Sequence, residues 1–326
     1  MENSMYEARK GDENKMGEIT LVTDFFDIGR GQDKNQELRK TAEKYLDAFK
    51  HWARIQNKLI VYTDSKSAKK VMEIRESFGR GDQTIIIEID NLFELEGELF
   101  ERMKKSAENS AFLNFRYLPE AFSNNPKYDY LWMMKYYFMN DAYNRGLLSD
   151  QVVWIDFGFD HGGLRYYSED FDFKWEYDFG DKINIFCLYS PDSVAGIETL
   201  QYLDDCVEGS MYGLPRELVP TFWQLIRNAM EALLMLDCVD DDQLLVMMAY
   251  KARPDLFKVE VTEWQMALKL RGGDHMRVKP KPVYKQENKY KRMVRLAVRK
   301  FIPNKKDPKR LYAKRCYETA VKFYGE

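Results

Sequence analysis

Residues 152–163 read VVWIDFGFDHGG, and this stretch decides how the rest of the chain is interpreted. It begins with four consecutive apolar residues, a pattern typical of a strand that is buried on both faces in an α/β sheet. Asp156 follows the apolar run directly, so we expect it at the carboxyl end of that strand. Open α/β sheets bind their ligands at this edge, and the functional centre is therefore predicted at Asp156.

The chain before this stretch alternates between predicted strands and predicted helices. The strands are expected at residues 19–23, 58–64 and 84–89, and the helices between them at 35–55 and 65–78. Such alternation predicts parallel strands that are joined by right-handed crossovers. A helix at 91–105, an irregular connector at 111–127 and an aromatic-rich helix at 128–145 then lead into the strand that ends before Asp156.

The chain after this stretch contains fewer clear patterns. Residues 166–180 are expected to form a loop or a short hairpin, and further strands are expected at 183–189 and 258–264. Helices are expected at 216–235 and 244–252. The predicted fold class is therefore α/β, with a Rossmann-like, mostly parallel central sheet that is flanked by helices.

The composition is that of a soluble protein of 326 residues, with 45% hydrophobic and 32% charged residues. Residues 1–17 form a polar leader without the apolar core of a signal peptide, and no later run approaches the roughly 20 apolar residues of a membrane-spanning helix. The cysteines at 187, 206, 238 and 316 lie far apart and form no CxxC pair, which argues against a zinc site or a disulfide framework. We therefore expect a cytoplasmic protein.

Charge is distributed unevenly along the chain. Residues 277–326 hold 17 Lys and Arg against 4 Asp and Glu, whereas residues 1–276 hold 33 against 49. Residues 287–302 place apolar side chains on one helical stripe, which predicts a basic amphipathic helix. An anionic inner-membrane surface would attract such a tail by about 1 kcal/mol for each Lys or Arg. The alternatives are a solvated helix packed on the body and nucleic-acid binding, which the acidic body opposes.

Asp156, Phe157 and Gly158 spell the DFG motif with which protein kinases bind metal ions. A kinase also needs a glycine-rich loop near its start and an HRD loop upstream of the motif. The chain contains neither, so a kinase is disfavoured.

The same strand end is better explained by the DxD motif of GT-A glycosyltransferases. These enzymes use it to hold Mn²⁺ or Mg²⁺, which neutralises the diphosphate of a nucleotide-sugar donor. Asp156 takes the place of the first acid, but Gly158 stands where the second is expected. Asp160 and His161 could supply the missing ligand, and His275 could be a late ligand from nearer the C-terminus. The alternative for Asp160 and His161 is a pair of exposed loop residues.

Two later segments resemble the acceptor side of such enzymes. Gly209 and Ser210 lie in a glycine-bearing turn, where a small residue lets the backbone approach the donor sugar. Asp241 and Asp242 precede the helix predicted at 244–252, and either could accept a proton from the acceptor hydroxyl or bind it. The alternative for these acids is a helix start whose positive end attracts negative charge.

Three blocks of the sequence, taken in order, resemble the signature of the HtrL/YibB (WlaTC-like) family of bacterial proteins. They are DFFDIGR at 24–30, Lys135 on the aromatic-rich helix and WIDFG at 154–158, and the resemblance extends over residues 19–264. It implies a GT-A-like fold and a glycosyltransferase of surface-polysaccharide synthesis, such as that of lipopolysaccharide or capsule. The domains would then be a polar leader (1–17), a GT-A-like domain (18–276) and a basic helical tail (277–326).

The same resemblance assigns residues to the donor site. The residues that would line the nucleotide end are Asp27, Gly29, Arg30 and Asp64. Lys135 or Arg30 would offset the charge of the diphosphate. The alternatives are a solvated helix residue for Lys135 and a salt bridge to a neighbouring acid for Arg30.

The predicted function is the transfer of a sugar from a nucleotide-diphosphate donor, a UDP-sugar, to a cell-surface polysaccharide or a lipid-linked glycan. Mn²⁺ or Mg²⁺ would be the cofactor, and the enzyme would work in the cytoplasm, peripheral on the inner face of the plasma membrane. The competing hypothesis is a non-catalytic, membrane-associated protein of the same fold that assists surface-glycan assembly. No nucleic-acid partner is expected.

Overall fold

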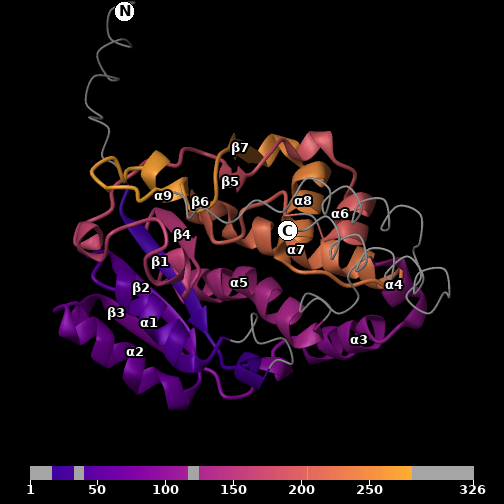
Figure 1. Ribbon diagram of the computed structural model, residues 1–326, viewed down its shortest axis with the longest axis horizontal. Coiled ribbons are helices and arrows are strands. Elements are labelled where there is room, and N and C mark those ends of the chain that lie inside the picture. Colours follow the sequence, from indigo (N-terminus) through magenta and orange to yellow (C-terminus); the bar gives the residue numbers. More distant parts are fainter. Residues whose placement is uncertain (1–16, 33–39, 117–124, 204, 281–326) are drawn as a thin grey trace, which may run out of the picture.

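The computed structural model describes residues 17–32, 40–116, 125–203 and 205–280. These residues form a sheet of seven strands in the order β3-β2-β1-β4-β6-β5-β7 (Figure 1). The strands are β1 (Ile19–Phe25), β2 (Lys58–Thr63), β3 (Thr84–Glu88), β4 (Gln151–Ile155), β5 (Ile183–Cys187), β6 (Met211–Pro215) and β7 (Phe257–Val261). Neighbouring strands are parallel, except that β6 runs antiparallel to both β4 and β5.

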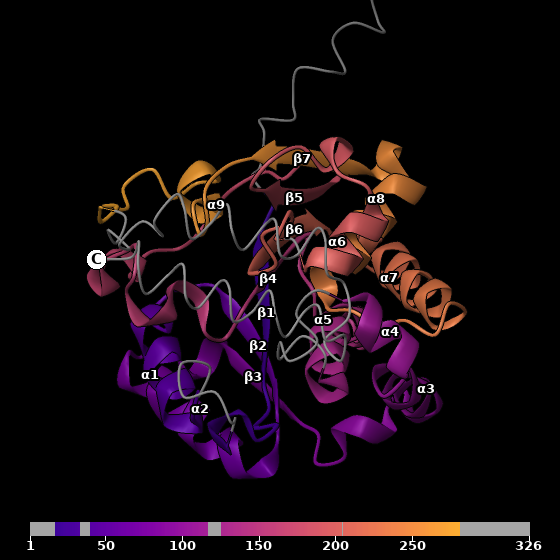
Figure 2. The same ribbon diagram turned by 45° about the vertical axis from the view of Figure 1, so that its right-hand side comes forward.

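Helices cover both faces of this sheet. They are α1 (Ala42–Trp52), α2 (Ser65–Ser77), α3 (Gly97–Ala107), α4 (Ser110–Phe115), α5 (Pro126–Asn144), α6 (Gly196–Tyr202), α7 (Val219–Leu234), α8 (Asp242–Ala252) and α9 (Ala267–Leu270). Figure 2 shows α1 and α2 on one side of the sheet, and α3, α5 and α7 on the other. The predicted fold class, a mostly parallel α/β sheet flanked by helices, is confirmed.

The strand that precedes Asp156 is buried on both faces, as its unalternating pattern predicted. Val152 and Trp154 of β4 belong to the hydrophobic core that includes α5 and α7. Val153 and Ile155 belong to the core on the side of α1. Alternate side chains of one strand therefore join two separate cores, so a shift of register by one residue would move each side chain into the wrong core.

Several helices begin at residues whose side chains cap them. Asp64 caps α2 by accepting a hydrogen bond from the N–H of Ser67 at 2.8 Å. Asn125 caps α5, and Asp241 caps α8. In each case a short polar side chain satisfies an N–H group that the first helical turn leaves open.

The largest difference from the sequence prediction is β6. Its residues were expected in a glycine-bearing turn before a helix, but they form a strand inside the sheet, between β4 and β5. Gly213 and Pro215 make this strand hard to predict from the sequence, because both residues are rare in strand interiors. Phe179 lies so close that a Cβ at Gly213 would be 2.2 Å from its ring. The Phe179 ring therefore packs directly on the backbone of β6. The strand is found with this tertiary contact, although its local propensity is low.

The remaining predicted elements occur with smaller shifts. The helix expected at 91–105 begins only at Gly97, and the connector expected at 111–127 overlaps the short helix α4. Residues 166–180 form a loop with a 3₁₀ turn at Ser168–Phe171, and no strand is described there. The sequence prediction does not include α6 or α9.

None of the helices in the described ranges is both long and apolar enough to cross a membrane. Residues 1–16 of the predicted leader and the amphipathic helix expected at 287–302 lie outside the described residues. Residues 277–279, assigned above to the tail, contact the body of the protein. Arg277 pairs with Asp170 at 2.8 Å, and Val278 forms a β-bridge with Tyr166.

Candidate functional site

The sheet changes its winding direction between β1 and β4. From β1 the chain continues to β2 and β3 on one side, and β4 then pairs with β1 on the other side. In open α/β sheets, ligands bind in the crevice beyond the carboxyl ends of such a pair of strands. Asp24, near the end of β1, and Asp156, directly after β4, lie at this point.

Three adjoining cavities open at this point of the sheet. Their volumes are about 50, 230 and 320 Å³, and Lys40 and Tyr45 lie in the walls of all three. The wall of the central cavity, of about 230 Å³, includes Asp156 and residues from α5, from the turn before β6 and from the start of α8. Segments that are far apart in the sequence therefore meet at one site.

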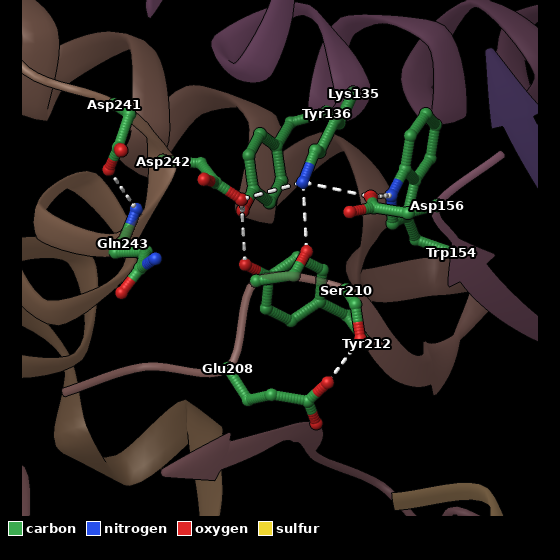
Figure 3. A network of polar contacts seen from close by, with 11 residues as sticks. Lys135, Tyr136, Trp154, Asp156, Glu208, Ser210, Tyr212, Asp241, Asp242 and Gln243 are labelled. Carbon is green, nitrogen blue, oxygen red and sulfur yellow. Dashed lines mark hydrogen bonds and ion pairs between the residues drawn. The ribbon is translucent and has the colours of Figure 1, made fainter. Parts of the chain in front are cut away.

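Lys135 of α5 forms the centre of a polar network in the wall of the central cavity (Figure 3). Its ammonium donates to Asp156 Oδ1 at 3.0 Å, to Asp242 Oδ2 at 2.9 Å and to the carbonyl of Gly209 at 2.8 Å. The side chain is only 1% exposed. The interpretation of Lys135 as a solvated helix residue is therefore excluded.

Lys135 is buried at this position because most faces of the helix α5 pack inside the protein. The buried residues include Tyr130, Met134 and Phe138, as expected for a helix inside a core. The ring centroid of Trp132 lies 3.6 Å from Lys135 Nζ, within the range of a cation–π interaction. The ammonium is thus enclosed by an aromatic ring and three oxygen atoms.

The carboxylates of Asp156 and Asp242 each accept a second hydrogen bond, from a side chain other than Lys135. Trp154 donates from Nε1 to Asp156 Oδ1 at 2.8 Å, and Tyr212 donates to Asp242 Oδ2 at 3.0 Å. Asp242 is the first residue of α8, where the open N–H groups of the helix favour negative charge. The two acids are therefore positioned by the protein itself.

Burial shifts the pKa values of the charged residues in and beside this network. It lowers the pKa of Lys135, but Asp156 and Asp242 raise that pKa by more, so the amine stays charged. Burial raises the pKa of Asp242, and Lys135 acts in the opposite direction. Burial raises the pKa of Asp24 well above its usual range, which favours its protonated form. Asp24 lines the smallest cavity, and its Oδ2 has no hydrogen-bond partner within the described ranges.

The turn before β6 comes close to the network because residue 209 is a glycine. A Cβ at Gly209 would lie 2.9 Å from Asp242 Oδ2, so a side chain there would displace the carboxylate or the turn. The neighbouring Ser210 donates a hydrogen bond to Glu208, which is fully buried. Burial raises the pKa of Glu208 to about 7. The close backbone approach expected at Gly209 is therefore made to Asp242.

The loop after β4 has an unusual backbone. Asp160, His161, Gly162 and Gly163 all have positive φ angles. The Asp160 carboxylate accepts hydrogen bonds from the backbone N–H groups of Arg165 at 2.6 Å and Tyr166 at 2.8 Å. Asp160 is completely buried and lies in the wall of none of the three cavities. Its carboxylate therefore stabilises the loop and does not point to the site.

Gly158, where the second acid of the DxD motif was expected, packs against Tyr45. A Cβ at residue 158 would lie 3.3 Å from Cδ1 of the Tyr45 ring, which leaves little room for an aspartate. The Tyr45 hydroxyl accepts a hydrogen bond from Arg30 at 2.6 Å. The Tyr45 ring, whose hydroxyl is hydrogen-bonded to Arg30, thus occupies the space beside Gly158.

Cations gather along the same wall. Arg30 lies 5.1 Å from the ring centroid of Tyr128, and Lys40 Nζ lies 3.4 Å from His161 Nδ1. Burial lowers the pKa of Lys40, and Arg30 lowers it further. Burial, followed by the charge of Lys40, lowers the pKa of His161 to about 4. His161 is therefore neutral at neutral pH, and Arg30 and Lys40 carry the positive charge.

The structure brings most of the predicted site residues together. Those in the wall of the central cavity are Arg30, Lys135, Asp156, His161, Gly209, Ser210, Asp241 and Asp242. Asp27 lines the smallest cavity and accepts a hydrogen bond from the N–H of Gly29 at 2.9 Å. Asp64 lies apart as the cap of α2, and His275 Nε2 lies 3.0 Å from the carbonyl of Asp170, outside these cavities.

The residues predicted to hold Mn²⁺ or Mg²⁺ do not converge. Asp160 binds backbone N–H groups, His275 lies elsewhere, and Asp156 Oδ1 faces an ammonium. Within the described ranges, no three or more His, Cys, Asp or Glu side chains are grouped so that they could hold a metal ion. These side chains therefore do not fit the predicted set of ligands.

Several residues in the cavity walls are absent from the predicted site. They include Asp24, Lys40, Tyr45, Tyr128, Trp132, Gln243, Trp264 and Gln265. Asp24 carries a usable signal, because it stands near the end of a strand as Asp156 does. The aromatic residues carry none, since a ring at helical spacing has the same pattern as a core residue.

The chain is similar to known proteins over the residues that form this sheet and site. The sequence model of the family described as "Bacterial protein of unknown function (HtrL_YibB)" matches residues 17–271. Protein HtrL of Escherichia coli (strain K12) is 28% identical over 257 residues, which cover 74% of this chain and 86% of that protein. The apo crystal structure of mouse xyloside xylosyltransferase 1 superposes with a TM-score of 0.42 and 13% identity, and covers 74% of this chain and 85% of that one.

Proposed function

The chain belongs to the HtrL_YibB family, as its sequence blocks predicted, and we propose that it is a glycosyltransferase. It transfers a sugar from a nucleotide-diphosphate donor, a UDP-sugar, to a cell-surface polysaccharide or a lipid-linked glycan. The basic segment at 277–326 holds it at the anionic inner-membrane surface, where such an acceptor is presented. The proposal is supported by the make-up of the cavity walls at the switch point of the sheet.

Aromatic and cationic side chains share these walls. Tyr45, Tyr128 and Trp132 offer surfaces on which a nucleobase can stack. Arg30 and Lys40 provide the positive charge that a diphosphate requires. This combination suits a nucleotide better than it suits an uncharged sugar alone.

Some buried polar atoms in the cavity walls have no hydrogen-bond partner among the described residues. They include Asp24 Oδ2, Trp132 Nε1 and Gln243 Oε1. Buried polar atoms nearly always have partners, so an unpaired atom in the wall of a cavity is suited to a bound ligand. With its raised pKa, Asp24 is suited to donate a proton in such a hydrogen bond.

Asp241 is the candidate residue for the acceptor. Its Oδ1 accepts a hydrogen bond from the N–H of Gln243 at 3.2 Å, and it lies in the wall of the central cavity. Burial and the neighbouring acids raise the pKa of Asp241, so its ionised form is a stronger base toward an acceptor hydroxyl than an ordinary carboxylate is. Asp242 has a different role, because its Oδ2 already accepts from Lys135 and Tyr212. We assign Asp242 to positioning.

Calorimetric titration with UDP and a panel of UDP-sugars tests donor binding. Arg30→Gln should weaken UDP binding by about tenfold, which corresponds to about 1.4 kcal/mol. Lys66→Ala is the matched control, because Lys66 is exposed on α2 and lies outside the cavities. Failure of the wild type to bind any nucleoside diphosphate would show that the proposal is wrong.

Donor turnover separates an enzyme from a non-catalytic protein of the same fold. Asp241→Asn should retain UDP binding and lose most of the hydrolysis or transfer of the donor sugar, which can be followed by UDP release. If the wild type binds the donor but releases no UDP with any glycan acceptor, the non-catalytic alternative is favoured.

A further inference from the structure

The ammonium of Lys135 is surrounded by oxygen atoms in the way that a bound cation is. Asp156 Oδ1, Asp242 Oδ2 and the carbonyl of Gly209 lie 3.0, 2.9 and 2.8 Å from Nζ. We call these three oxygens the cation cage. An ammonium has three N–H donors, so the cage uses all of them. Lys135 therefore has no donor left for a ligand in the cavity.

The oxygens of the cation cage come from three separate elements. Asp156 follows β4, Gly209 lies in the turn before β6, and Asp242 is the first residue of α8. The Asp156 and Asp242 side chains are only 16% and 5% exposed. Without a positive charge between them, two poorly hydrated carboxylates would repel each other. The arrangement of these elements therefore depends on a cation at this point.

The dimensions of the cation cage suit an ammonium. Distances of 2.8–3.0 Å are typical of charged N–H···O hydrogen bonds. Mg²⁺ requires oxygen ligands at about 2.0–2.1 Å, so the three oxygens would have to move inward. Residue 158 supplies no further carboxylate, because it is a glycine, and Tyr45 leaves little room for a side chain there. The acid set of a divalent-metal site is thus present only in part.

We propose that Lys135 replaces the divalent cation in this site, and that the site works without a bound metal ion. The ammonium neutralises and aligns Asp156 and Asp242, so Lys135 is a positioning residue. Arg30 and Lys40 then supply the charge that meets an anionic ligand. The metal-free use of a nucleotide donor rests on the proposed function, whereas the replacement of the cation in the cage does not.

Removal of the ammonium should convert the cation cage into a metal site. Mn²⁺ alone is the probe, and electron paramagnetic resonance reports the free ion. Lys135→Ala should bind Mn²⁺ at least about tenfold more tightly than the wild type, because two carboxylates and a carbonyl then face an open space. The double variant Lys135→Ala/Asp242→Asn should return to the wild-type affinity. Lys127→Ala is the matched control, since Lys127 is exposed on the same helix.

Two results would overturn the proposal. One is tight Mn²⁺ binding by the wild type that Asp156→Asn abolishes, because the ion would then bind beside Lys135. The other is a folded Lys135→Ala protein that binds Mn²⁺ no better than the wild type. If Lys135→Ala folds only when Mn²⁺ is present, the proposal is supported, because the ion then supplies the missing charge. If Lys135→Ala folds neither with nor without Mn²⁺, the Mn²⁺ affinities of the wild type and of Asp156→Asn decide. Tight binding that Asp156→Asn abolishes overturns the proposal, and weak binding by the wild type supports it.

Titration of the protein with UDP, once in the presence of EDTA and once in the presence of Mn²⁺, tests whether donor binding needs a metal ion beside the cation cage. The wild type should bind UDP with the same affinity in both solutions, to within about twofold. Binding that requires Mn²⁺ would overturn the metal-free site. Absence of UDP binding in both solutions would contradict the proposed donor, while the Mn²⁺ titrations would still test the cation cage.

Discussion

Lys135, Asp156 and Asp242 carry charge where little water reaches them, and each depends on the others. Removal of one member of a buried ion pair typically costs about 3–5 kcal/mol, because the remaining charge is left unpaired. Glu208 behaves differently. Its Oε2 has no hydrogen-bond partner in the part of the chain that the structure describes, and burial raises its pKa to about 7. At the residue scale, the site therefore contains both a compensated charge and a carboxyl that titrates near neutral pH.

Glu208→Gln should remove part of the pH dependence of stability. The ordinary pKa of this carboxyl is 4.5 and its pKa in the folded protein is about 7, so the folded state holds an extra proton between these values. The stabilisation is complete below about pH 4.5 and is lost as the pH rises through about 7. Urea unfolding across this range should show a steeper decline for the wild type than for the variant. Parallel declines would contradict the assignment, and exposed Glu176→Gln is the control.

At the scale of elements, the sequence predicted the strands and helices whose own pattern is strong. The apolar runs of β1, β2 and β4 and the aromatic-rich α5 occur where they were expected. The strand β6 was not predicted, because Gly213 and Pro215 make its local preference weak. Within the sheet, the backbone of β6 at Gly213 lies against the ring of Phe179, a residue far from it in sequence.

Arg75 shows how one side chain can join several elements. It is completely buried on α2. It donates to the carbonyls of Ala53, Ile55 and Asn57 and to the hydroxyl of Thr84. Arg75→Met should lower the free energy of unfolding by about 2–4 kcal/mol, because these buried acceptors lose their donor.

Urea denaturation measures the effect of this substitution. Lys69→Ala is the matched control on the same helix, since the Lys69 side chain is 85% exposed. It should change the free energy of unfolding by no more than about 0.5 kcal/mol. An equal effect of both substitutions would show that Arg75 does not join these elements.

At the scale of the whole molecule, charge is divided between an acidic body and a basic C-terminal segment. A truncation that tests the segment should end after Pro280, because Arg277 and Val278 contact the body. The full chain should sediment with anionic liposomes and be released by salt, since charged contacts weaken when screened. The truncated chain should remain in solution. Equal sedimentation of both chains would contradict a membrane role, and neutral liposomes provide the control.

The sequence by itself determined the class of fold and the position of the strand-end acid. A run of four apolar residues is typical of a strand that is buried on both faces, and the residue after such a strand is expected at the edge of the sheet. Asp156 was located in this way, and the helix start at Asp241 and Asp242, one of the two interpretations of these acids, follows from an equally local pattern. These features depend on neighbouring residues only, so the sequence expresses them directly.

The tertiary structure alone decided which side chains meet. Lys135 and Asp242 are 107 positions apart, and a local pattern shows that each segment is buried without showing against which other segment. The predicted metal ligands separated for the same reason. Asp160 and His161 are adjacent, but the backbone turn between them sends one carboxylate into the loop and leaves the imidazole in the cavity wall. Packing of distant segments therefore placed an ammonium, rather than a group of metal ligands, beside Asp156.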